Sequence, residues 1–110
     1  MPHDMRHLTK EQLSQIYREV VLSPQRRIVL LDVGVSKRIP VSEENQNVYC
    51  IGPMGEVHWQ IQADKVINER DSFVSLSIGK DGQIRADRFF GNEFLVNPDT
   101  GVAEHIGWHK

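Results

Sequence analysis

The histidine pairs of this chain come closest to a metal-binding pattern. His105 and His109 are four residues apart, as are His3 and His7. On a helix, that spacing can place two imidazoles on one zinc ion. His105 falls in a predicted strand, where residues i and i+4 lie ~13 Å apart, and His3 lies close to the first residue. Because no third ligand is predictable, we expect no metal site and no cofactor.

Cys50 is the single cysteine and the one thiol that could act as a nucleophile. Catalysis would require a depressed thiol pKa and a base such as His58 or His105 within hydrogen-bond reach. Cys50 lies between Tyr49 and Ile51 in a predicted strand, where cysteine commonly packs as a small hydrophobe. We therefore expect no catalytic residue here, and a single cysteine excludes an intramolecular disulfide.

Charged side chains offer a different chemistry, the binding of a polar ligand. Arg85, Asp87 and Arg88 are clustered in one predicted strand. Together with His58 and His105 they could line a polar pocket and supply acid–base groups. The alternative interpretation is ion pairing across a solvated sheet face, which contributes less than ~1 kcal/mol per pair.

Aromatic side chains are candidates for a protein interface, because exposed rings are common interface anchors. Phe89 and Phe90 are adjacent in a predicted strand, so one of them should leave the inner face of the sheet. Trp108 and Tyr49 would extend an apolar surface beside it. A second apolar surface on a small sheet favours association. We expect a protein partner or a homodimer, with these four residues as interface candidates.

The stretch from Phe73 to Trp108 must position most of these residues. It contains four strand-length apolar runs separated by three turns. Asp81-Gly82 is a strong hairpin signal, and Gly91 and Gly101 suit turn positions with positive φ. Connections this short make neighbouring strands antiparallel. The stretch therefore predicts a four-stranded meander.

The segments before the meander complete the predicted fold. A capping-box pattern at Thr9–Gln12 and apolar residues at helical spacing predict a helix over 9–22. Residues 26–35 read as a strand covered on both faces, and 47–62 as a hairpin. We therefore expect an α+β fold, with one N-terminal helix packed on a mostly antiparallel sheet of about seven strands.

Length and composition indicate one soluble domain. The 110 residues are 39% hydrophobic and 25% charged, as in ordinary globular proteins. We expect a single domain over 1–110, with a flexible tail at 1–8 and a β-rich part at 26–108. The net charge of −2 gives no general attraction to nucleic acid or membranes. The N-terminal residues lack the apolar core of a signal peptide, so we expect a cytoplasmic protein that binds neither membrane nor nucleic acid.

Two segments resemble repeat units of quinoprotein-type β-propellers. VYCIGPMGEVHWQI and FLVNPDTGVAEHIGW each contain a strand, a turn with glycine and a second strand that carries tryptophan. The resemblance implies local strand–turn–strand geometry and no quinone, because a propeller needs roughly four or more blades. The layout is also similar to that of small uncharacterised bacterial proteins, some of which are similar to immunity proteins of toxin systems.

Two functional hypotheses follow. The first is a non-catalytic protein-interaction module, in its narrower form immunity-like, that binds through a sheet face or edge. The alternative is a small-molecule binder or small enzyme with a polar pocket between helix and sheet. The second hypothesis requires that His58, Arg85, Asp87, Arg88 and His105 converge on one cleft.

Overall fold

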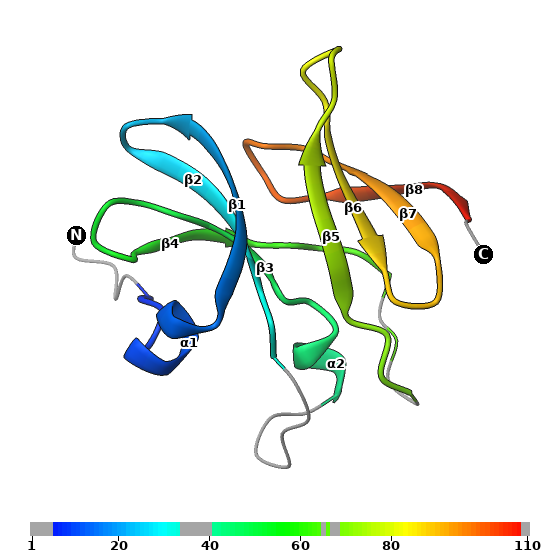
Figure 1. Cartoon of the computed structure of the whole chain (residues 1–110), viewed down its shortest axis with the longest axis horizontal. Helices are drawn as coiled ribbons and strands as arrows, with labels where there is room; N and C mark the ends of the chain where they lie inside the picture. Colours follow the sequence, from blue (N-terminus) through cyan, green and yellow to red (C-terminus); the bar gives the residue numbers. More distant parts are fainter. Residues whose placement is uncertain (1–5, 34–40, 65, 67–68, 109–110) are drawn as a thin grey trace.

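Two four-stranded antiparallel sheets make up most of the computed structural model, which describes residues 6–33, 41–64, 66 and 69–108. The strand orders are β1-β2-β3-β4 and β5-β6-β7-β8, and the two sheets lie side by side in Figure 1. The elements are α1 (Lys10–Ser14), β1 (Ile16–Ser23), β2 (Arg26–Leu31), α2 (Val41–Glu44), β3 (Val48–Ile51), β4 (Val57–Gln60), β5 (Phe73–Ile78), β6 (Ile84–Arg88), β7 (Asn92–Val96) and β8 (Ala103–Trp108).

The predicted α+β fold with one sheet of about seven strands is wrong. The described residues form eight strands in two sheets, and their helices are the five-residue α1 and the four-residue α2. The protein is therefore mostly β. The largest error lies in residues 9–22, which were predicted to form one helix.

The start of that helix was predicted correctly, but not its length. Thr9 forms the expected capping box: its hydroxyl accepts a hydrogen bond from the Gln12 N–H at 3.0 Å, and its own N–H donates to Gln12 Oε1 at 2.8 Å. The chain then leaves the helix after Ser14, and β1 pairs with β2 across a two-residue turn at Pro24-Gln25. An isolated helix of this length is marginal, so a full strand ladder and burial of Val20 outweigh the helical pattern.

The predicted meander is confirmed. Strands β5 to β8 are neighbours in sequence order, with Leu76 opposite Ala86 and Ile84 opposite Val96. The hairpin predicted over 47–62 is also present, as the antiparallel pair β3–β4. Turn chemistry therefore predicted strand neighbours correctly wherever the connection is short.

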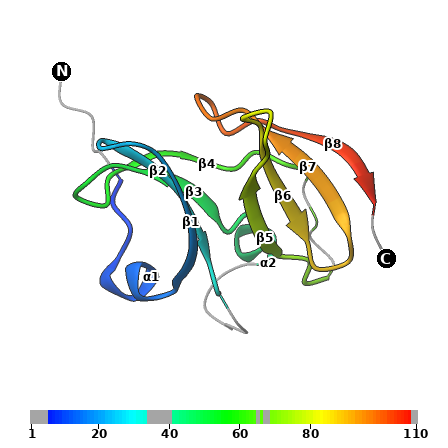
Figure 2. The ribbon, with the colours of Figure 1, turned by 45° about the horizontal axis from the view of Figure 1, so that its top comes forward.

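The main core lies between the two sheets. Its buried members come from both: Val20, Ile28, Leu30, Val48, Cys50, Trp59, Ile61, Phe73, Leu76, Ile84, Ala86, Phe94 and Val96. A second cluster lies on the other face of the first sheet and consists of Leu8, Val29, Leu31, Tyr49 and Ile51. The segment with α1 runs along this side of the molecule, away from the second sheet (Figure 2). Strand β2 is thus buried on both faces, as its uninterrupted apolar run predicted.

The turn between β7 and β8 connects the second sheet to the first. The carbonyl of Pro98 accepts hydrogen bonds from Trp59 Nε1 at 2.9 Å and from the Arg26 guanidinium at 2.7 Å. Gln62 continues the connection, because its N–H donates to the Gly101 carbonyl at 2.8 Å and its carbonyl accepts from the Ala103 N–H at 3.0 Å. The two sheets are therefore joined by hydrogen bonds along this margin.

Gly101 is essential to that connection. It has φ +79°, and a Cβ atom there would lie 2.5 Å from the Trp59 ring. We expect Gly101→Ala to lower the free energy of unfolding by about 2–4 kcal/mol, from left-handed backbone strain plus overpacking. Gly82 also has φ +79° but nothing within 4 Å, so Gly82→Ala should cost about 1–2 kcal/mol. Urea denaturation of both variants measures the difference, and equal losses would contradict the proposed clash.

Candidate functional site

Arg88 lies at the centre of a buried polar network that supports the exposed residues of the second sheet. Its guanidinium donates to the carbonyls of Asn45 at 2.8 Å, Asp71 at 2.6 Å and Asp64 at 2.8 Å. Its charge also lies 4.5 Å from the centre of the Phe73 ring. Burial lowers the pKa of Arg88, and the nearby Asp71 carboxylate partly opposes that shift. The hydrogen bonds offset the cost of burying the cation.

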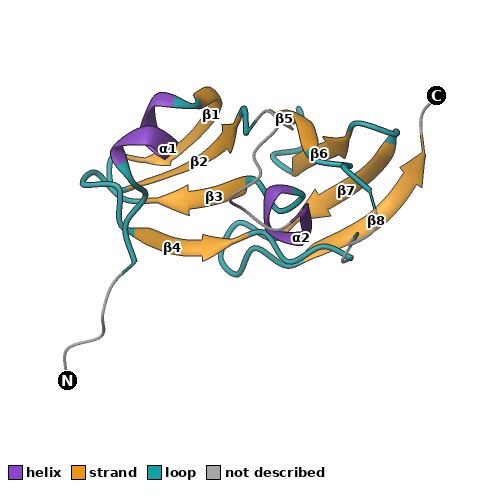
Figure 3. Ribbon diagram, turned by 90° about the horizontal axis from the view of Figure 1, so that it is seen from below, coloured by secondary structure: helices purple, strands orange, loops and turns teal. Residues whose placement is uncertain are grey.

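Two asparagines extend this network between the sheets. The Asn47 side chain, buried next to β3, bonds to both the N–H and the carbonyl of Phe73 in β5, at 2.8 and 2.9 Å, and to the Leu31 carbonyl at 2.7 Å. Asn45 accepts from the Asp71 N–H at 2.8 Å and donates to the Glu69 carbonyl at 2.9 Å. These residues follow α2, which lies where the two sheets meet (Figure 3).

Asp71 connects the network to the β6–β7 turn. Its Oδ1 accepts a hydrogen bond from the Phe90 N–H at 2.8 Å. The Phe89 N–H donates to the Ser72 carbonyl at 2.9 Å, and Gly91, with φ +105°, donates to the Arg88 carbonyl at 2.9 Å. The backbone of this turn is therefore held from both sides.

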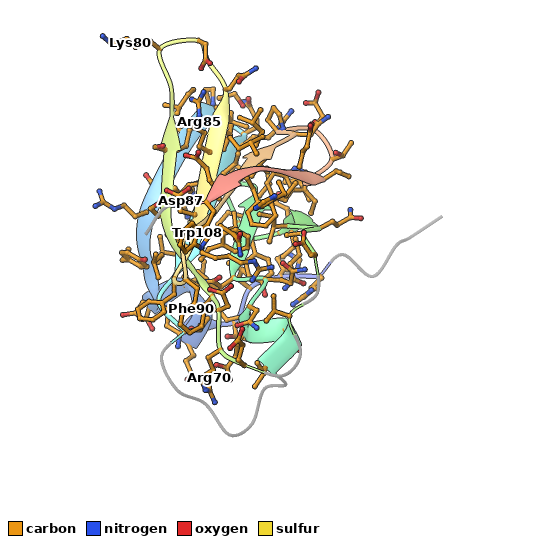
Figure 4. The ribbon with its side chains drawn as sticks, turned by 90° about the vertical axis from the view of Figure 1, so that its right-hand side faces the viewer. Arg70, Lys80, Arg85, Asp87, Phe90 and Trp108 are labelled. Atoms are coloured by element: carbon orange, nitrogen blue, oxygen red, sulfur yellow. The ribbon has the colours of Figure 1, made fainter. Side chains whose placement is uncertain are left out.

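Three rings gather at this turn and are called here the aromatic cluster: Phe89, Phe90 and Trp108. Their exposed fractions are 67%, 49% and 58%. The two Phe rings meet edge to face with centroids 5.3 Å apart, and Trp108 Nε1 donates to the Phe90 carbonyl at 2.9 Å. Phe90 and Trp108 lie next to each other on the face shown in Figure 4. Such anchored, exposed rings are typical of protein-binding surfaces.

The structure places the fourth interface candidate elsewhere. Tyr49 is buried in the second core cluster on β3, and Arg6 lies over its ring at 5.4 Å. Burial raises the pKa of its hydroxyl. The expectation for Phe89 and Phe90 also changes, because β6 ends at Arg88. Both rings belong to a turn, and both leave the core.

The five polar-pocket candidates do not converge. His58 is exposed on β4 of the first sheet, and His105 is exposed on β8, where its ring contacts Asn92 Oδ1 at 2.9 Å. Asp87 accepts from the Ser75 hydroxyl at 2.8 Å, on the face of β6 opposite to Arg88. Arg85 shares that outer face of β6 with Asp87, whereas Arg88 is buried on the other face. The five side chains therefore do not meet in one cleft.

Cys50 and the histidine pairs form no reactive group within the described residues. Cys50 is fully buried in the main core, and the charged groups that act on its thiol are Arg26 and Asp99, so no histidine is placed to act as its base. His3 and His109 lie outside the described residues. In the described part of the chain, no group of three or more His, Cys, Asp or Glu side chains is placed to hold a metal ion. No helix described in the structure is long and apolar enough to cross a membrane.

Comparison with known proteins identifies the family. A family model described as "Domain of unknown function (DUF7957)" matches residues 9–108. The chain therefore belongs to this family, and the match covers every strand of both sheets. No curated protein and no solved structure matches the chain.

Sequence reasoning did not predict the role of Arg88, although a signal was present. Arg88 has the same strand parity as Ile84 and Ala86, and all three side chains are buried on one face of β6. An arginine in phase with core residues indicates a buried cation with hydrogen-bonded oxygens around it. The oxygens come from residues 45, 64 and 71, so no local pattern could have named them.

We expect Arg88→Met to destabilise the protein by about 2–5 kcal/mol, because three carbonyls lose their donor and two of these hydrogen bonds are fully buried. Arg85→Met is the matched control. Arg85 lies on the opposite face of the same strand and pairs with half-exposed Asp81 at 3.2 Å, so its loss should cost less than ~1 kcal/mol. Chemical denaturation followed by Trp fluorescence compares the two, and similar values would contradict a structural role for Arg88.

The Cys50 thiol should be unreactive in the folded protein. Burial raises its pKa, with nearby Arg26 partly opposing the shift, so both access and the thiolate fraction are reduced. We expect a chromogenic disulfide reagent at mildly alkaline pH to label the native protein far more slowly than the protein in guanidinium chloride. Rapid stoichiometric labelling of the native protein would contradict this expectation.

Proposed function

We propose that this protein is a non-catalytic protein-interaction module whose partner binds the aromatic cluster. The observation that carries the proposal is that three large rings are exposed together at a turn whose backbone is held by hydrogen bonds. Burying one such side chain stabilises a complex by about 1.5–3 kcal/mol. A small cluster of this kind can supply much of the affinity of an interface.

Preorganisation of the turn supports the proposal further. Phe90 is held through its N–H by buried Asp71 and through its carbonyl by the Trp108 indole. An interface whose rings are already placed loses less conformational entropy on binding. The buried network under the turn would therefore favour binding as well as stability, because it fixes the turn before a partner arrives.

Side-chain docking fits the second sheet better than strand addition. Beyond Ala103, β8 borders no other strand among the described residues, so it is a free edge. The β7–β8 register shifts between Glu93 and Phe94, with Ile106 as the extra residue on β8. Irregularities of this kind help natural edge strands to avoid pairing with other chains. We therefore place the contact on the rings and not on the backbone edge.

The alternative of a small enzyme or a small-molecule binder has less support. It requires His58, Arg85, Asp87, Arg88 and His105 in one cleft, and these side chains do not converge: Arg85 and Asp87 share the outer face of β6, but Arg88 is buried on its other face and the histidines lie on β4 and β8. The narrower proposal within the leading class is an immunity-type role in the bacterial cytoplasm, in which the partner is a toxin. A buried free thiol is compatible with that reducing setting, and a toxin gene beside this one would support the immunity-type role.

The experiment compares the wild type with a Phe89→Ser/Phe90→Ser variant. Both residues are exposed, so we expect an unchanged fold by circular dichroism and a free energy of unfolding within about 1 kcal/mol. Sedimentation over a range of concentrations tests self-association, and affinity capture from the native host tests for a different partner. We expect one of the two associations to be lost in the variant.

Val21→Ser is the matched control, because Val21 is an exposed apolar residue on β1 of the other sheet. The control should associate like the wild type. If the double variant captures the same proteins and sediments in the same way as the wild type, the aromatic cluster is not the interface. A wild type that is monomeric and captures nothing specific would also contradict the proposal.

A further inference from the structure

A groove of ≈470 Å³ lies at the end of the second sheet opposite to the aromatic cluster. One wall is the tip of the β5–β6 hairpin, and the other is the β7–β8 turn. The tip projects from the body at the top of Figure 1. The lining residues are Gly82, Gln83, Ile84, Leu95, Val96, Asn97, Pro98, Asp99, Val102 and Glu104. Its size is within the range of ligand sites.

Both walls of the groove are held rigidly. The β7–β8 turn is fixed to the first sheet, because the Pro98 carbonyl accepts from Trp59 and Arg26. In the hairpin tip, the Gly79 N–H donates to the Gln83 carbonyl at 2.8 Å, and the Gln83 N–H donates to Asp81 Oδ1 at 3.0 Å. The groove therefore exists before any ligand arrives.

The lining has apolar sides and a negative rim. Leu95 and Val102 supply aliphatic surface, and Val102 is 51% exposed. The charged lining residues are Asp99 and Glu104, and none of the residues that line the groove carries a positive charge. A matching ligand therefore combines an aliphatic stem with a cationic head, as the side chains of lysine and arginine do.

Two nearby cations of the chain are already paired, one of them with a residue that lines the groove. Arg26 pairs with Asp99 from the side of the first sheet at 3.3 Å, and Arg85 pairs with Asp81 at 3.2 Å. Lys80 projects from the hairpin tip away from the sheets, and Arg85 lies below it (Figure 4). Within the described residues, no ion pair involves Glu104, so its carboxylate is the charge that an incoming cation would meet.

We propose that this groove binds an arginine or lysine side chain from an extended segment of a polypeptide partner. The aliphatic stem lies against Leu95 and Val102, and the cationic head pairs with Glu104 at the rim, because Arg26 already balances the charge of Asp99. Leu95 and Glu104 are opposite each other across β7 and β8, so stem and head contacts are adjacent. This site is separate from the aromatic cluster and does not depend on the function proposed above.

Two blocked pentapeptides test the proposal: acetyl-Gly-Val-Arg-Val-Gly-amide, and the same peptide with citrulline, a neutral isostere, in place of arginine. We titrate each into the isotopically labelled full chain and follow the backbone amide signals. The arginine peptide should shift the signals of Gly82, Leu95, Val102 and Glu104. The citrulline peptide should bind about two- to fivefold more weakly, which is the range that one exposed ion pair supplies.

Two variants establish which charge is involved. Glu104→Gln should weaken the arginine peptide to the level of the citrulline peptide, whereas Glu11→Gln, an exposed change in α1, should leave its affinity unchanged. Added salt should weaken only the charged peptide. Because Glu104 is exposed, the Glu104→Gln protein should keep the wild-type amide signals away from the groove. An unchanged spectrum there distinguishes lost binding from misfolding.

Three results would overturn the proposal. The first is an arginine peptide that shifts none of these four amides up to high millimolar concentration. The second is equal binding of the arginine and citrulline peptides. The third is agmatine, a free alkylguanidine, binding as tightly as the peptide, which would assign the groove to a small cation instead of a polypeptide.

Discussion

The buried cation of Arg88 is the constraint on which the rest of this structure depends. A guanidinium inside a small β protein is tolerated only when oxygens surround it. Here the oxygens belong to segments that are far apart in the sequence, on both sides of the boundary between the sheets. Two of the residues that accept from Arg88 also bond to each other, because the Asp71 N–H donates to Asn45 Oδ1. The same hydrogen bonds therefore stabilise the buried cation and hold the segments between the two sheets together.

This network also determines what the protein presents to solvent. Asp71 lies between Arg88, which donates to its carbonyl, and Phe90, which donates to its carboxylate. Through Phe90 it reaches Trp108. The aromatic cluster is thus an extension of a rigid core and not a set of rings on a loose loop. At the other end of β8, the groove is held by a separate set of hydrogen bonds to Pro98, so the second sheet carries two independent surfaces.

Sequence reasoning was most accurate where the interactions are local. Asp81-Gly82 and the glycines of the next two turns predicted the β5–β8 meander correctly, because turn conformation depends on adjacent residues. The predicted helix was wrong for residues 16–22, where helical spacing and strand pairing compete. The pairing of β1 with β2 decided the outcome, and only the two-residue turn at Pro24-Gln25 indicated it. The division into two sheets was also missed, because no local pattern shows where a sheet ends.

For the candidate site, residue types in the sequence determined which side chains could take part in binding, and the tertiary structure decided which of them are exposed. Phe89, Phe90 and Trp108 were recognisable as interface candidates from ring chemistry and position. Tyr49 was equally plausible by type, yet the N-terminal segment covers it. Arg85 and Arg88 are three residues apart, but Arg85 lies on the outer face of β6, whereas Arg88 is buried and donates to three carbonyls. The chemistry of each side chain can be read from the sequence. Its exposure follows only from the fold, because burial depends on contacts between distant segments.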